Sequence, residues 1–167
     1  MLSLLDNHAK LIKVIASSGG IVGRKKLQKI IYILKKCGLP FEEKYTFYFY
    51  GPYSEELSLR IEELTNLGFI SEIREEKSHY HQYRYDVTDQ GEEFIEHSPV
   101  ELPAVDALVT EMKGESSRFL ELVSTMLYFD HLPKEEIEAK VQEVKKKSNY
   151  TDDDINEAWQ FIDKLKH

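Results

Sequence analysis

Apolar residues recur at helical spacing through most of this chain, and this periodicity limits the fold more than any other feature. A stripe with this spacing predicts an amphipathic helix, which must bury its apolar face against another element. Three other stretches alternate between the two sides of an extended chain, as strands do. The sequence therefore predicts an α+β fold that is mostly α. The helical stripes run over Leu4–Ile15, Leu27–Leu34, Leu57–Leu67, Val105–Met112, Phe119–Phe129, Ile137–Val144 and Ile155–Ile162.

The order of the predicted elements separates the chain into two regions. Three helices precede a strand over Phe69–Glu75, a polar turn and a return strand over Tyr80–Val87. This is the order of a winged helix, so we expect residues 1–97 to form a winged-helix-like domain with a small antiparallel sheet. Two prolines mark a linker over 98–103, and residues 98–167 are expected to form an acidic helical region. The candidate N-caps are Ser3, Ser54, Thr88 and Thr151.

The stretch YTFYFYGPYSEEL, which starts at Tyr45, concentrates aromatic rings immediately before one short turn. Alternation over 45–50 predicts one strand, placed beside the hairpin, with a rigid turn at Gly51-Pro52 behind it. Phe49 would then share a face with Tyr45 and Phe47. Tyr48 and Tyr50 would lie on the other face. Two interpretations of that second face stay open: it packs on the C-terminal helices, or it forms an exposed surface for a partner.

The charge balance disfavours long-range attraction to nucleic acid. The net charge is -8, of which residues 98–167 contribute -6, from 9 Lys/Arg and 15 Asp/Glu. A nucleic-acid binder with this balance needs a local basic patch. No apolar run approaches a membrane span, no secretory signal is recognisable at the start, and the single Cys37 excludes a disulfide within the chain. We therefore expect a cytoplasmic protein.

The stretch GRKKLQKIIYILKK is the best candidate for such a patch. Its functional interpretation is phosphate contact, and its structural one is the solvated face of an amphipathic helix. The third helix, which enters the groove in many winged helices, is acidic here and has Arg60 as its one basic residue. Like charge facing phosphate is unfavourable, so DNA binding is the alternative rather than the leading hypothesis. The candidate nucleic-acid contacts are Arg24, Lys25, Lys26 and Lys29.

Neither a metal site nor a catalytic constellation is indicated. His79 and His81 offer two ligands of one strand face without a third at a motif spacing. The stretch TDDDINEAW fails the calcium-loop pattern, because Glu157 stands where glycine is needed, and it is better explained as a helix cap at Thr151. Lysines near Cys37 in sequence would lower the pKa of its thiol, but no base accompanies it. We therefore expect no cofactor, no metal and no enzyme activity.

Several motifs carry a family resemblance. KKLQKIIYILKKCGLPF, YFYGPYSEEL and RIEELTNLGFI together resemble the YwgA-like group of uncharacterised proteins from Bacillus and its relatives, over nearly the whole chain. Over about residues 20–95 the chain is also similar, more distantly, to the Panacea domain of SocA-like antitoxins. That domain has a KLQKLLY-like helix and a YGPV-like turn. In addition, YDVTDQG resembles the Y-x-L-T-x-x-G motif that often closes the wing of bacterial winged-helix regulators.

The resemblance implies protein binding. Panacea-type antitoxins neutralise toxins by direct contact, and one acts as an adaptor that hands its toxin to a protease. Our leading hypothesis is a protein-binding module, antitoxin-like or adaptor-like, with an unidentified protein partner. Its alternative is a DNA-binding regulator, and a homodimer is left open. The residues assigned to the partner contact are Tyr48, Tyr50, Tyr53 and Arg60.

Overall fold

The computed structural model describes residues 4–166, so the candidate N-cap Ser3 lies outside the described residues. The fold is α+β and mostly α, as predicted. The helices are α1 (Leu4–Ser18), α2 (Arg24–Lys36), α3 (Glu55–Asn66), α4 (Asp89–Glu96), α5 (Val105–Lys113), α6 (Ser117–Tyr128), α7 (Lys134–Val144) and α8 (Asp152–Lys166), with a 3₁₀ turn at Lys146–Ser148. The strands are β1 (Ile21–Val22), β2 (Thr46–Tyr48), β3 (Gly51–Tyr53), β4 (Ile70–Glu76) and β5 (His81–Val87).

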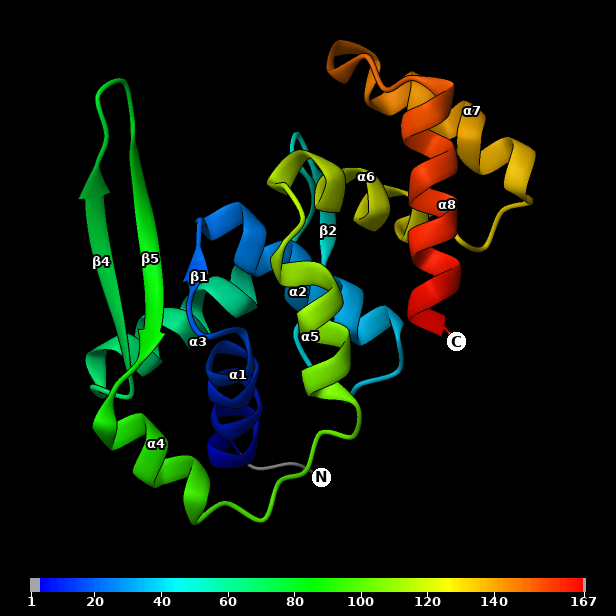
Figure 1. The fold of residues 1–167 in the computed structure, drawn as a ribbon. Coiled ribbons are helices and arrows are strands. Elements are labelled where there is room, and N and C mark those ends of the chain that lie inside the picture. Colours follow the sequence, from blue (N-terminus) through cyan, green and yellow to red (C-terminus); the bar gives the residue numbers. More distant parts are fainter. Residues whose placement is uncertain (1–3, 167) are drawn as a thin grey trace.

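One small antiparallel sheet has the strand order β1-β5-β4. The β4–β5 hairpin pairs residue by residue from Ile70 with Val87 to Glu76 with His81, and β1 adds to the far side of β5. Figure 1 shows this hairpin extending away from the helices, at the end of the molecule opposite α7 and α8. The hairpin predicted at residues 69–87 is therefore present.

The aromatic stretch does not form the single strand that alternation predicts. It forms β2 and β3, a separate two-stranded sheet in which Tyr48 lies opposite Gly51 and Thr46 opposite Tyr53. The chain therefore reverses at Phe49-Tyr50, ahead of Gly51-Pro52. Gly51 has a φ of 89°, a conformation that glycine adopts without strain, so the reversal ends on it. The prediction of one strand paired beside the β4–β5 hairpin was wrong.

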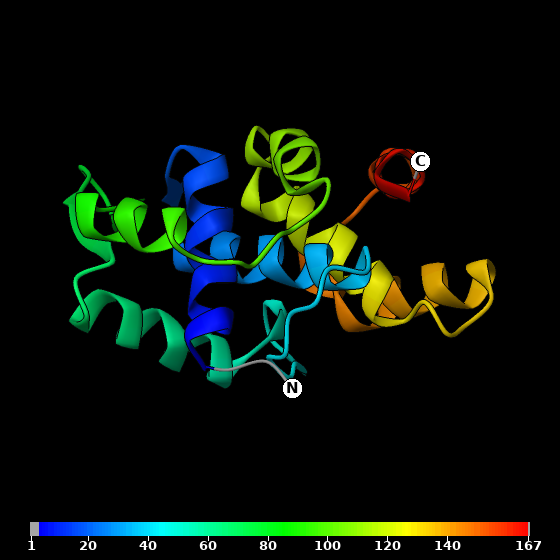
Figure 2. The ribbon, with the colours of Figure 1, turned by 90° about the horizontal axis from the view of Figure 1, so that it is seen from below.

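One continuous apolar core joins the N-terminal and C-terminal helices. α2 packs against α6, α1 against α5, and α6 in turn against α8. α6 is central, as its apolar composition predicted, with Leu120, Val123 and Met126 almost fully buried. Figure 2 shows from below how α1 crosses α2, with α7 and α8 beyond α6. Within residues 4–166, no helix combines the length and the apolar composition needed to cross a membrane.

Side-chain caps begin three helices where the sequence predicted them. The Ser54 hydroxyl accepts a hydrogen bond from the backbone N–H of Leu57 at 3.0 Å, and the Thr88 hydroxyl accepts one from that of Gly91 at 3.1 Å. At α8, Thr151 and Asp154 each accept from the other's backbone N–H, so the acidic TDDD run is a capping box. This confirms the cap interpretation of that run.

Gly91 explains why the YDVTDQG motif ends in glycine. A Cβ at this position would lie 2.1 Å from the carbonyl oxygen of Phe69, where the start of α4 crosses the chain entering β4. We expect Gly91→Ala to destabilise the protein by about 1–3 kcal/mol, although alanine favours helix, because backbone must move. Gly114→Ala is the matched control, since nothing lies within 4 Å of its added Cβ. Urea unfolding measures both; equal midpoints would contradict the steric argument.

Candidate functional site

The β2–β3 hairpin is fixed from behind by two buried lysines. The Lys145 ammonium donates to the carbonyl oxygen of Phe49 at 2.6 Å, and the Lys29 ammonium donates to that of Pro52 at 3.0 Å. Lys145 also pairs with Glu121 of α6 at 3.2 Å. Their exposed fractions are 1% for Lys29 and 4% for Lys145. Ammonium groups from α2 and from the end of α7 therefore hold the turn against α6.

The hairpin approaches α6 closely at Gly51. A Cβ added at Gly51 would contact Glu121 and Thr125 at 3.4 Å and Lys29 at 3.6 Å, so the backbone approaches the buried charges closely. Phe47 packs on the same side, with ring centroids 5.2 Å from Tyr128 and 5.5 Å from Phe129. The ring that packs on the C-terminal helices is thus Phe47, and not Tyr48 or Tyr50 as one interpretation held.

The tip of the hairpin presents three exposed aromatic rings. The exposed fractions are 45% for Tyr48, 94% for Phe49 and 55% for Tyr50. Alternation over 45–50 predicted that Phe49 shares a face with Tyr45 and Phe47, but β2 ends at Tyr48. Once the chain turns there, the period of two no longer applies. Phe49 is the residue that the prediction missed.

A groove of about 600 Å³ lies beside this tip, between the hairpin, α3 and the start of α2. It brings together residues from two separate predictions. Three of the four predicted partner contacts line it, and so do two of the four basic residues of the DNA alternative. The side chains that line the groove include Tyr48, Tyr50, Tyr53, Arg24, Lys25 and Glu72.

Polar and cation–π contacts orient these rings. The Lys25 ammonium lies 3.2 Å from the centroid of the Tyr50 ring. The Tyr48 hydroxyl donates to Glu55 at 3.4 Å, and the hydroxyls of Tyr53 and Ser58 are 2.9 Å apart. The tyrosines thus keep hydrogen-bonding groups at the solvent while their rings line the groove.

Arg60 lies apart from the groove. Its guanidinium pairs with Glu63 at 2.8 Å, and Glu63 in turn contacts Nε2 of the buried His8 at 3.0 Å. Arg60 does not line the groove with the three tyrosines. Glu63 thus links α3 to α1, and Arg60 pairs with Glu63 within α3. The assignment of Arg60 to the partner contact stays a prediction.

The basic stretch does not present one open face. Lys29 is inside, where burial, reinforced by the nearby Lys145 and Lys25 and opposed by Glu121, lowers its pKa to about 8. Lys26 donates to the carbonyl oxygen of Lys113 at 2.7 Å. Arg24 stacks 3.7 Å from the centroid of Tyr83. Of the four predicted phosphate contacts, Lys29 is therefore unavailable to a phosphate in this conformation.

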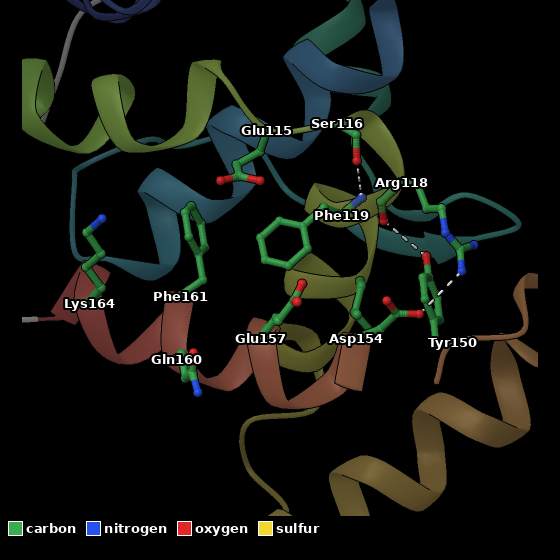
Figure 3. Close-up of a pocket in the computed structure, with 11 residues that line it drawn as sticks. Glu115, Ser116, Arg118, Phe119, Tyr150, Asp154, Glu157, Gln160, Phe161 and Lys164 are labelled. Carbon is green, nitrogen blue, oxygen red and sulfur yellow. Dashed lines mark hydrogen bonds and ion pairs between the residues drawn. The ribbon is translucent and has the colours of Figure 1, made fainter. Parts of the chain in front are cut away.

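A second hollow, of about 490 Å³, lies between α6 and α8 (Figure 3). Tyr150 forms one wall; its hydroxyl donates to the carbonyl oxygen of Arg118 at 3.2 Å, and burial raises its pKa to about 12. The charges there are largely paired, Arg118 with Asp154 at 3.6 Å and Lys164 with Glu111 at 2.7 Å. These contacts tie α8 to α5 and α6.

In the part of the chain that the structure describes, metal-ligating side chains do not cluster. Among residues 4–166, no three His, Cys, Asp or Glu side chains are grouped so that they could hold a metal ion. Burial raises the pKa of the half-buried Cys37 thiol, and Lys166 opposes this only partly. The expectation that lysines near Cys37 in sequence lower its pKa was wrong: the pKa is raised by burial, and the lysine that opposes this, Lys166, is distant in sequence.

The lowered pKa of Lys29 predicts how stability depends on pH. Below about pH 8 the ammonium is charged in both states, so the full cost of burying it is present. Between about 8 and the unfolded value of 10.5, the unfolded chain binds more protons, and stability rises with pH. We expect the free energy of unfolding of wild type, minus that of Lys29→Met, to rise over this window. Urea unfolding of both proteins from pH 7 to pH 10.5 measures it, and a constant difference would contradict the assignment.

The comparison with known proteins agrees with the closer of the two resemblances. No family model matches the chain. It is 54% identical over 163 residues to the uncharacterised protein YwgA of Bacillus subtilis (strain 168), a match that covers 98% of each chain. Identity at this level over nearly the full length leaves no large segment of either protein outside the alignment. The chain belongs to the YwgA family.

Proposed function

We propose that this chain is a non-enzymatic protein-binding module of the bacterial cytoplasm, and that it engages its partner with the tip of the β2–β3 hairpin and the adjoining groove. The observation that carries the proposal is the nearly complete exposure of Phe49, between two half-exposed tyrosines, on a turn whose backbone is fixed. Leaving a phenylalanine in water forgoes roughly 1.5–3 kcal/mol of burial energy. A partner that covers it recovers this energy.

The fixed backbone favours binding further. Ordering a loop at an interface weakens association, and a turn held by buried ammonium groups has lost that freedom already. Tyrosine and phenylalanine bury large areas with few rotatable bonds, which is why aromatic residues dominate binding hot spots. The tip therefore combines the residue types and the rigidity of an anchor.

The proposal includes a winged-helix-like arrangement of the N-terminal elements. In this interpretation β4–β5 is the wing of a winged helix that is built from α1, β1, α2, α3, β4 and β5, and the β2–β3 hairpin is an insertion between α2 and α3. In the Panacea-like interpretation, the KLQK helix corresponds to α2 and the YGPY turn to the hairpin. Gln28 of that motif joins the two, because its amide exchanges hydrogen bonds with the backbone of Ser54 at 2.9 Å. An antitoxin-like or adaptor-like role rests on this analogy.

The partner contact is tested with Tyr48→Ala combined with Tyr50→Ala. A partner is first captured from Bacillus subtilis lysate and purified, and its dissociation constant is then measured against each variant. Because two central ring anchors are lost, we expect affinity to fall by about 100-fold or more, with circular dichroism and urea midpoint unchanged. Tyr80→Ala is the matched control, since Tyr80 is also 60% exposed but lies at the far end of the β4–β5 hairpin. Full binding by the folded double variant would sink the proposed surface.

The DNA alternative predicts a different response. Fluorescence anisotropy with mixed duplex DNA at about 50 and 200 mM salt tests it. We expect no binding at the lower salt, because α3 has Glu55 and Glu56 in its first turn and Lys29 is buried. Tight binding that is lost at the higher salt would instead assign the surface around Arg24 and Lys25 to nucleic acid.

A further inference from the structure

The strand β4 leaves one edge of the sheet open. In the order β1-β5-β4, β5 is central and β4 is terminal, and no other described strand pairs with its outer side. Figure 1 shows this side facing away from the helices. β4 contains neither proline nor glycine, and it pairs with β5 one residue to one residue from Ile70 to Glu76, so no bulge interrupts it. Such a regular edge exposes unpaired backbone groups that can template another strand.

The side chains along β4 are self-complementary about its centre. Ile73, at the middle of the seven residues, is 52% exposed. Glu72 and Arg74 flank it and share the opposite face, since successive side chains alternate. A two-fold axis at Ile73 would set the acid of one strand opposite the base of the other, so the two side chains would attract each other.

We propose that a second copy of this chain occupies the edge, with β4 pairing antiparallel to its counterpart about a two-fold axis at Ile73. In this register the two Ile73 side chains lie opposite each other. Glu72 of each copy faces Arg74 of the other, which forms two cross-strand ion pairs. A continuous antiparallel sheet then runs through both molecules, with each β4 as an interior strand.

Neighbouring registers are less favourable. A two-fold at Arg74 sets the two arginines against each other and Glu72 against Glu76. A two-fold at Glu72 sets two carboxylates together. Like charges directly opposite are destabilising in antiparallel pairs. The charge pattern therefore selects the register centred on Ile73.

The present partners of the two charged residues are compatible with this pairing. Arg74 is 3.0 Å from Glu76 of its own strand, but their side chains are 54% and 69% exposed, and a pair this exposed contributes little. Glu72 accepts from the Tyr85 hydroxyl at 2.7 Å and contacts Arg24 at 3.4 Å. Those contacts orient Glu72, and a carboxylate has capacity for a further donor.

Disulfide trapping tests the register directly. Directly opposed residues of an antiparallel pair have Cα atoms about 4.5–5.5 Å apart, within the range of about 4.4–6.8 Å that a disulfide spans. In a Cys37→Ser background, we expect Ile73→Cys to give a cross-linked dimer under mild oxidation. Glu75→Cys is the matched control: in this register the two positions lie four residues apart along the strands, roughly 13 Å, so it should not cross-link. Equal cross-linking by both variants would overturn the register.

Sedimentation equilibrium of the full chain without added cysteine tests the association itself. Between about 1 µM and 1 mM protein, we expect wild type to form dimers. Arg74→Glu should raise the dissociation constant roughly tenfold or more, because it replaces two ion pairs by two like-charge pairs. Lys77→Glu makes the same charge change beyond the end of β4 and should leave the dimer intact. A wild type that stays monomeric, or a dimer that Arg74→Glu does not weaken, would overturn the inference. The contact at the aromatic hairpin is tested separately, with a different partner and different variants.

Discussion

The structure depends on two buried ammonium groups that share one carboxylate. Lys29 and Lys145 lie beside Glu121, so one positive charge in this cluster lacks a countercharge of its own. A buried charge is tolerated only when hydrogen bonds replace its lost water. The carbonyl oxygens of Phe49 and Pro52 supply them. The β2–β3 hairpin is therefore not an appendage on the surface, because it completes the coordination of charges that the helices bury.

This arrangement also explains how the two halves of the chain hold together. Lys29 comes from α2, Glu121 from α6 and Lys145 from the end of α7, and the hairpin lies over all three. The expected boundary at residue 97 crosses a continuous core, in which α2 packs on α6 and α1 on α5. Whether 1–97 and 98–167 are separate domains stays a prediction. The charged cluster gives the hairpin a role on both sides of that boundary.

Local physics explains which features the sequence predicts well. The helices follow from apolar periodicity, and the caps at Ser54, Thr88 and Thr151 follow from side chains that reach their own backbone. The aromatic hairpin was predicted incorrectly because alternation has the same pattern whether or not the chain reverses after Tyr48. Only pairing between strands distinguishes the two cases. Lys29 likewise lies off the apolar stripe of α2, and its burial depends on α6 and the hairpin, which are distant in sequence.

The same limit applies to the candidate site. In the sequence, the tyrosines and the basic residues lie on different elements and indicate two rival sites. The groove joins them, and Lys25 lies over the ring of Tyr50 rather than in open solvent. Glu72 connects the groove to the open edge of the sheet, because it lines the groove and belongs to the edge strand β4. A second copy that brings its Arg74 to Glu72 would alter the charge of the groove wall. Self-association at the sheet edge and partner binding at the hairpin would then be coupled through one carboxylate.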